Sequence, residues 1–205
     1  MQRSLPAVRR LPQPARQEGK DSGKNPHSLT SPSDSWRPPA ISAAGSKAIS
    51  FVGPSGSGKT ALICRLVPWF KAQGLEVAVL KHTHKQYLGE ARKDTGRFAQ
   101  AGARLVALAG PGGLQITRYS SADPPLETVL AALAPEADLI LVEGYKGSSL
   151  PKVALVGPGV EDVLPDLSQV IALISTEPID SPLPVFNPQQ TAELGAFLKK
   201  YLGYD

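Results

Sequence analysis

The chain has 205 residues, of which 41% are hydrophobic and 20% charged, and its formal net charge is +4 at pH 7. This length allows one domain with a hydrophobic core. No stretch approaches the roughly 20 consecutive apolar residues that a transmembrane helix needs. An ordinary globular domain with no membrane partner is therefore expected.

The cysteine content bears on the compartment. The single cysteine, Cys64, excludes an intramolecular disulfide framework and fits a reducing compartment. Because Leu62, Ile63 and Leu66 surround it, we interpret Cys64 as a small core residue rather than a nucleophile.

The net positive charge lies in the N-terminal segment. Residues 1–46 contain seven basic and three acidic side chains, whereas the remaining chain contains 15 of each. The segment also holds seven of the 20 prolines and has no apolar periodicity, which is typical of disorder. We expect a disordered tail over 1–45, either dispensable or making a weak contact with a polyanion, and a folded domain over 46–205. Because the folded part is neutral, no nucleic-acid partner is inferred.

Short apolar runs alternate with helical patterns from residue 46 onward. In chain order, the predicted elements are a strand over 48–53, a helix over 59–74, a strand over 76–82, a helix over 94–103, a hairpin of 104–110 and 114–120 around Pro111-Gly112-Gly113, a helix over 125–137, strands over 138–144, 152–157 and 170–176, and a helix over 188–203. Strands that are apolar at consecutive positions are buried on both faces, as in a parallel sheet between helices. We therefore predict a three-layer α/β fold whose sheet is mostly parallel, and mixed because of the hairpin.

The segment between the first strand and the first helix matches the pattern G-x-x-x-x-G-K-[ST] at every defined position. Its residues are Gly53, Pro54, Ser55, Gly56, Ser57, Gly58, Lys59 and Thr60. Glycines let backbone N–H groups converge on a phosphate, and the dipole of the following helix attracts the same anion. Lys59 adds positive charge for the β- and γ-phosphates, and the Thr60 hydroxyl is a ligand for Mg²⁺. The pattern predicts a P-loop NTPase domain.

A carboxylate at the end of a neighbouring strand would hold Mg²⁺ or its water. Glu143 follows an apolar run and precedes Gly144, which permits close approach to phosphates. Asp138, at the start of the same run, is the competing candidate. Because the apolar run ends on Glu143, we favour Glu143, with a solvated loop position as the alternative.

Four segments occur in this order along the chain: GPSGSGKT (53–60), LKHTH (80–84), KDTGRFAQAGA (93–103) and DLILVEGYKGSSLPKVAL (138–155). Together they resemble the molybdopterin-guanine dinucleotide biosynthesis protein B (MobB) family, a GTP-binding group of P-loop proteins. The P-loop alone is generic, whereas the combination in this order is much more specific. The resemblance extends over most of residues 47–190 and leaves out the tail.

The resemblance implies a homodimeric, cytoplasmic accessory protein of molybdenum cofactor biosynthesis. Such a protein binds GTP with Mg²⁺, hydrolyses it slowly, and assists the molybdenum cofactor guanylyltransferase that attaches GMP to molybdopterin. By matching position, the resemblance also implies that the P-loop binds phosphate, that Glu143 takes the Walker B role and that Asp94 lies near the nucleotide and metal. The residues implied to line the adjacent face are Lys81, His82, Thr83 and His84.

Several residues keep two interpretations. His82 and His84 form a polar wall facing a phosphate or a pterin, or they merely cap the sheet, since too few further ligands accompany them for a zinc site. Asp94 acts at the site, caps a helix, or does both. Lys146 and Lys152 face an anionic pterin phosphate or a second subunit, or they lie in a solvated loop.

The sequence gives little information on which base is bound and on how fast the nucleotide is hydrolysed. No N-K-x-D guanine-reading motif is present, and Asp180 or Glu177 is the hypothetical substitute. Because no arginine finger or water-orienting glutamine is evident, at most weak GTPase activity is expected. One alternative is a small-molecule kinase, although its candidate lid arginines, Arg92 and Arg97, are few. The other is a non-catalytic adaptor switched by nucleotide.

Overall fold

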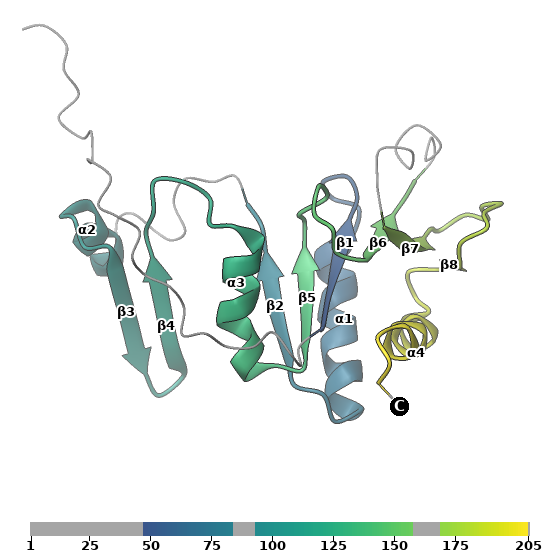
Figure 1. Ribbon diagram of the computed structural model, residues 1–205, viewed down its shortest axis with the longest axis horizontal. Helices are drawn as coiled ribbons and strands as arrows, with labels where there is room; N and C mark the ends of the chain where they lie inside the picture. Colours follow the sequence, from purple (N-terminus) through teal and green to yellow (C-terminus); the bar gives the residue numbers. More distant parts are fainter. Residues whose placement is uncertain (1–46, 84–92, 158–168, 205) are drawn as a thin grey trace, which may run out of the picture. The chain divides into compact units, whose positions relative to one another are not determined.

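The computed structural model describes residues 47–83, 93–157 and 169–204 (Figure 1). The expected disordered tail over 1–45, its boundary with the domain, and the positions of His84 and Arg92 lie outside these residues and stay predictions. Within the described ranges, no helix has both the length and the apolar character that a membrane crossing requires.

Six parallel strands form the main sheet, in the order β2-β5-β1-β6-β7-β8. Their bounds are Lys47–Val52 for β1, Val77–Lys81 for β2, Leu139–Glu143 for β5, Lys152–Leu155 for β6, Val170–Ile174 for β7 and Val185–Phe186 for β8. The five predicted parallel strands are confirmed to within about two residues. The two-residue β8 is too short to produce a periodic pattern, so the sequence did not predict it.

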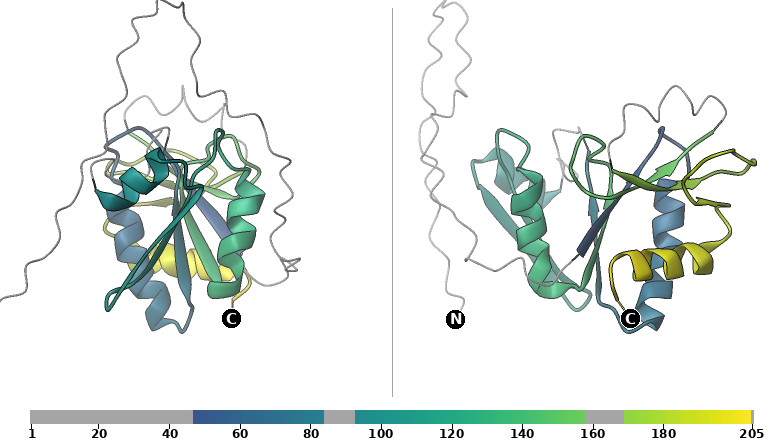
Figure 2. Two further views of the ribbon diagram at one scale, coloured as in Figure 1. Left: turned by 90° about the vertical axis from the view of Figure 1, so that its left-hand side faces the viewer. Right: turned by 45° about the vertical axis from the view of Figure 1, so that its right-hand side comes forward.

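Helices cover both faces of this sheet, which confirms the three-layer α/β architecture. Helix α1 (Lys59–Ala72) and helix α3 (Leu126–Leu133, followed by the 3₁₀ turn η1, Ala134–Glu136) lie on opposite faces (Figure 2). Helix α4 (Thr191–Tyr201) packs beside α1. The main core lies between the sheet and helices α1 and α4, where Phe51, Phe70 and Leu198 are fully buried.

The predicted hairpin is confirmed as an antiparallel pair, but it forms a sheet of its own. It consists of β3 (Leu105–Gly110) and β4 (Gly113–Arg118), and it follows helix α2 (Asp94–Gln100), which contacts β3. The main sheet is therefore parallel throughout, and the antiparallel pair lies outside it. On this hairpin Leu105, Leu114 and Ile116 are each more than half exposed.

Cys64 is exposed on α1, so its expected place in the core is wrong. Leu62, Leu66 and Phe70 are spaced four residues apart and point to the sheet, together with Ile63. At about 100° of rotation per residue, Cys64 falls outside that buried stripe although its sequence neighbours are apolar.

Helices α1 and α4 approach each other closely at Gly195. A Cβ atom at this position would lie 2.5 Å from a ring carbon of Trp69 on α1. A second link comes from Arg65, which donates hydrogen bonds to the Pro188 carbonyl at 2.7 Å and to the Thr191 hydroxyl at 3.3 Å. The two helices can therefore approach this closely only because residue 195 is a glycine.

We expect Gly195→Val to lower the free energy of unfolding by about 2 kcal/mol, because overpacking a tight contact costs roughly 1–3 kcal/mol. Urea denaturation followed by circular dichroism measures this change. Gly112→Ala is the matched control, since an added Cβ there meets nothing within 4 Å, and its effect should stay within about 0.5 kcal/mol. Equal stability of Gly195→Val and the unmodified chain would contradict the packing described.

Candidate nucleotide-binding site

The P-loop connects β1 to α1 as predicted, and three of its glycines have a backbone that other residues rarely adopt. The φ angles are 145° at Gly53, 77° at Gly56 and 91° at Gly58. At Gly53 a Cβ atom would also lie 2.5 Å from the Leu155 carbonyl oxygen of β6. The loop can therefore curl at the end of the sheet only because these side chains are absent. Helix α1 begins directly after it, at Lys59.

The Lys59 ammonium lies inside the curl of the loop. It donates hydrogen bonds to the carbonyl oxygens of Pro54 at 2.6 Å and Gly53 at 3.0 Å, with the Ser57 hydroxyl at 3.4 Å. These partners are neutral, so a phosphate oxygen would be a stronger partner for the same ammonium group. The cation is thus already positioned where an anion would enter.

Glu143 is brought to the P-loop by strand pairing. Residue Phe51 of β1 pairs with Glu143 of β5, and Lys81 of β2 pairs with Glu143 from the other side. The Thr60 hydroxyl donates to Glu143 Oε2 at 2.8 Å, and Lys81 Nζ lies 3.0 Å from Oε1. Asp138, the competing acid, lies at the opposite end of β5, where it accepts a hydrogen bond from the Glu76 N–H at 2.9 Å. The geometry therefore agrees with the preference for Glu143.

The surroundings of Glu143 favour its ionised form. Burial by itself raises the pKa of Glu143. Hydrogen bonds from Lys81 and Thr60, and the charges of Lys81 and Lys59, outweigh this effect and hold the pKa below its ordinary value. Two hard oxygen donors, the Thr60 hydroxyl and an ionised carboxylate, suit Mg²⁺, which takes its other ligands from water and phosphates. These two residues fit the ion that the sequence predicts.

The segment after Glu143 has a strained backbone and forms an aromatic stack. Gly144 has φ 106°, and an added Cβ would lie 3.1 Å from the Cβ of His82. Tyr145 has φ 54°, a value that costs about 1–3 kcal/mol for a residue with a side chain. Its ring lies on the His82 ring, with centroids 4.3 Å apart, and His82 Nε2 lies 3.3 Å from Asp123 Oδ2. The stack joins the ends of β2 and β5 to the segment before α3.

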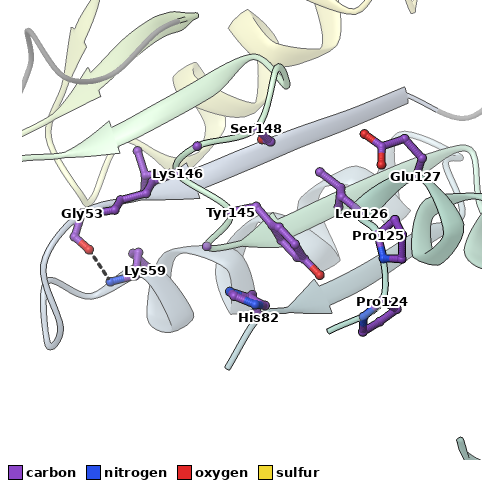
Figure 3. A pocket seen from close by; sticks show the side chains of 13 residues that line it. Gly53, Lys59, His82, Pro124, Pro125, Leu126, Glu127, Tyr145, Lys146 and Ser148 are labelled. Atoms are coloured by element: carbon purple, nitrogen blue, oxygen red, sulfur yellow. Dashed lines mark hydrogen bonds between the residues drawn. The ribbon is translucent and has the colours of Figure 1, made fainter. Parts of the chain in front are cut away.

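An open cavity of about 650 Å³ lies beside this stack and borders the P-loop (Figure 3). Gly53 and Lys59 contribute to one end, and the start of α3 contributes to the other. Lys146 also lines it and is exposed, so whether it faces a ligand or lies in a solvated loop stays a prediction. His82 lines the cavity as well, and its role toward a phosphate or a pterin also stays a prediction.

Lys152 differs from its expected position. It is fully buried in β6, and its ammonium donates to the carbonyl oxygens of Ser148 at 2.5 Å and Leu150 at 3.0 Å. Burial lowers the pKa of Lys152. The residue therefore ties the loop after β5 to the sheet, and neither a solvated loop position nor an exposed contact with a second subunit fits it.

Asp94 is the first residue of α2 rather than its N-cap, which is Lys93. Its carboxylate is 84% exposed and lies 3.8 Å from the Arg97 guanidinium. The expected helix cap is therefore wrong, because the side chain stands one position too late to accept the first N–H bonds. A role of Asp94 toward a nucleotide stays a prediction, and Arg97 is already paired with this acid.

Three residues of this region were not singled out as functional by sequence reasoning: Tyr145, Asp123 and Ser148. Each is an ordinary loop residue in the sequence, and only the folded chain brings Tyr145 and Asp123 into contact with His82. Of the three, Tyr145 alone has a position in the sequence that could have indicated a functional role, because it directly follows the Glu-Gly pair at the end of a buried strand.

A glycine loop between a central parallel strand and the first helix, facing a carboxylate at the end of the next strand, defines the P-loop class of α/β proteins. Comparison with known proteins narrows this class. The family model described as molybdopterin guanine dinucleotide synthesis protein B matches residues 48–176. The chain therefore belongs to this family, as the resemblance predicted.

Individual relatives agree with this assignment. The chain is 28% identical over 161 residues to the molybdopterin-guanine dinucleotide biosynthesis adapter protein of Haemophilus influenzae, covering 75% of the chain and 88% of the relative. A crystal structure of a MobB protein homologue from Bacillus stearothermophilus matches with a TM-score of 0.60 and 31% identity, over 76% of this chain and 97% of that one. A crystal structure of molybdopterin-guanine biosynthesis protein B matches with a TM-score of 0.63 and 26% identity, over 76% of this chain and 98% of that one.

Replacing Lys81 with Met should raise the pKa of Glu143 in the nucleotide-free protein, because burial remains while the main ion pair is lost. The lowered pKa means that Glu143 stabilises the fold above its unfolded pKa, and that this contribution disappears as the pH falls through the folded value. In the variant this contribution should be smaller, and its loss should be complete at a higher pH. Carboxyl-carbon NMR across pH 2–7 measures the shift, with Lys71→Met as control. An unchanged Glu143 pKa would contradict the ion pair.

Proposed function

We propose that this protein binds GTP with Mg²⁺ at the P-loop and acts as an accessory protein in the step that attaches GMP to molybdopterin. The observation that carries the proposal is the family match over residues 48–176, which spans the P-loop, Glu143 and the cavity-lining loop after β5. The partners in this proposal are molybdopterin and a molybdenum cofactor guanylyltransferase. We also infer a cytoplasmic location, where GTP is available.

The phosphates would lie in the curl of residues 53–60. Backbone N–H groups of the loop and of the N-terminus of α1 would donate to the phosphates, and Lys59 would exchange its two carbonyl partners for phosphate oxygens. Thr60 and Glu143 would hold Mg²⁺, which neutralises charge on the β- and γ-phosphates. Lys81, which lies 3.4 Å from the Thr60 hydroxyl, adds a second positive charge on the same side.

The guanine base would lie on the side of β1 that faces β6 and β7, away from β5 and β2. The strand order places β6 and β7 there, and the loop after β7 contains the hypothetical base readers Glu177 and Asp180. Both side chains are exposed. An aspartate or glutamate in this position would accept hydrogen bonds from the N1 and N2 protons of guanine. Preference for GTP over ATP follows from the proposal.

Hydrolysis of GTP is proposed to be slow. Of the two candidate lid arginines, Arg97 lies in the described part of the chain, where it is largely exposed and 3.8 Å from the Asp94 carboxylate, and we infer no arginine finger from it. Fast turnover with an added alcohol would favour the alternative of a small-molecule kinase. No phosphate release, alone or with the guanylyltransferase, would favour a nucleotide-switched adaptor.

We further propose that the protein is a homodimer that uses the outer face of the hairpin, defined as Leu105, Ala107, Ala109, Leu114 and Ile116. Cross-strand pairing puts these five side chains on one face, with Arg118 at its edge, and all five are exposed; on the opposite face Val106 is buried and Leu108 is exposed. A contiguous apolar surface of this kind favours burial against another protein surface. A second copy presents the same face, which suits a two-fold interface.

Lys59→Ala should weaken GTP binding by at least about 100-fold, because hydrogen bonds to charged groups contribute about 1.5–3 kcal/mol each. Isothermal titration calorimetry with GTP and with ATP, in Mg²⁺, measures this loss and the guanine preference. Lys71→Ala, an exposed lysine in the last turn of the same helix, is the matched control. Unchanged affinity of Lys59→Ala for GTP would overturn the phosphate site, and equal affinity for ATP would overturn the guanine preference.

Ile116→Lys should convert the dimer into a monomer at micromolar concentration, because it puts a charge in the middle of the proposed apolar interface. Analytical ultracentrifugation measures the mass. Gln115→Lys adds the same charge one residue away on the opposite face and should leave the dimer intact. A dimer that survives Ile116→Lys, or an unmodified chain that sediments as a monomer, would refute this interface.

A further inference from the structure

The cavity of about 650 Å³ lies on one particular side of the P-loop. The strand order places β5 and β2 on this side of β1, and β6 and β7 on the other. The cavity is lined by the ends of β1, β2 and β5 and by the start of α3. The cavity shares Gly53 and Lys59 with the P-loop, so in the proposed site it adjoins the bound phosphates on the side away from the base. It is therefore placed for a second ligand rather than for the base of the nucleotide.

One wall of the cavity is aromatic. The Tyr145 ring lies over the His82 ring, with centroids 4.3 Å apart and ring planes tilted by 32°, and His82 in turn contacts Asp123. Figure 3 shows this ring standing between His82 and the side chains of Pro124 and Pro125, which form the facing wall. A flat wall of this kind favours a planar heterocycle, because ring stacking is strongest on a preformed aromatic face.

The polar groups of the cavity are arranged from one end to the other. Among the described residues that line it, Glu127 in the first turn of α3 has the one carboxylate. Lys59 and Lys146 lie toward the P-loop end, near Gly53 (Figure 3). Between these ends, Ser148 Oγ is the buried side-chain oxygen or nitrogen without a hydrogen-bond partner in the part of the chain that the structure describes. A buried hydroxyl of this kind favours a ligand or water that completes its hydrogen bonding.

A carboxylate at one end and ammonium groups at the other define the chemistry of the ligand. The carboxylate pairs with adjacent N–H and NH₂ donors, such as those of a 2-amino-4-oxopyrimidine ring. The ammonium groups pair with a phosphate. The aromatic wall between them accommodates the ring system. Pterins and guanine both have the 2-amino-4-oxopyrimidine edge, so the chemistry alone fits either.

We propose that this cavity binds a phosphorylated pterin, with the ring on Tyr145, the 2-amino edge toward Glu127 and the phosphate toward Lys146. The assignment rests on the proposed function, in which molybdopterin is the second substrate of the step. The pterin would then lie next to the terminal phosphates of the bound nucleotide. The pterin is favoured over a second guanine because the base of the nucleotide lies on the other side of β1 in this proposal.

The test uses the full chain saturated with Mg²⁺ and a non-hydrolysable GTP analogue, with neopterin 3′-phosphate as a fluorescent probe. The unmodified chain should bind the probe, and Tyr145→Ala and Glu127→Gln should each weaken binding by about ten-fold or more. Tyr145→Phe should retain the stack and most of the affinity. Glu136→Gln, an exposed glutamate beyond the end of α3, is the matched control and should bind normally.

Affinity for the GTP analogue is measured on the same variants and should change by less than about two-fold. If the unmodified chain binds the GTP analogue but not the probe, the pterin site is refuted while the nucleotide site stands. If it binds no GTP analogue, the proposed function itself fails. Displacement of the probe by GMP as readily as by unlabelled neopterin phosphate would contradict the pterin assignment, as would normal probe binding by both Tyr145→Ala and Glu127→Gln.

Discussion

Parallel pairing of β1 with its neighbour β5 is the constraint on which the whole site depends. It sets Phe51 opposite Glu143, so the residue that ends β5 arrives beside the loop that leaves β1. The pairing of β2 with β5 brings Lys81 to the same level from the other side. Three segments separated by dozens of residues therefore deliver a glycine loop, an acid and a lysine to one edge of the sheet. A shift of register by one residue would move Glu143 to the opposite face and disassemble the site.

Two lysines and one carboxylate lie at this edge, so its local charge is positive. The carboxylate of Glu143 is only 12% exposed, and Lys81 and Lys59 favour its ionised form despite burial. In the proposed complex, Mg²⁺ would be the new partner of the carboxylate and phosphate oxygens would be the new partners of the ammonium groups. A positive local charge would favour binding of the negatively charged nucleotide.

Sequence reasoning recovered most of the fold because the elements have strong local signals. The P-loop pattern, the apolar parallel strands and the hairpin turn each follow from backbone chemistry that acts over a few residues. Prediction from the sequence failed where burial depends on the direction in which a side chain points or on contacts with residues distant in the sequence. Cys64 has apolar neighbours yet faces solvent, since the buried stripe of α1 runs at a different angle. Lys152 looked like a loop lysine and is buried, because its ammonium is satisfied by carbonyl oxygens that only the folded loop supplies. The cavity wall of Tyr145 and His82 depends on tertiary packing and could not be found locally.

A crystal structure of the full chain with Mg²⁺ and a non-hydrolysable GTP analogue would show whether the loop after β1 binds the terminal phosphates of a guanine nucleotide. We expect the β-phosphate inside the curl of residues 53–60, with the Lys59 ammonium moved from the carbonyl oxygens of Gly53 and Pro54 to phosphate oxygens. We also expect Mg²⁺ between Thr60 and Glu143, directly or through a water. Phosphates bound outside the loop, or a Lys59 ammonium still on its two carbonyl partners in the complex, would contradict the proposed phosphate site.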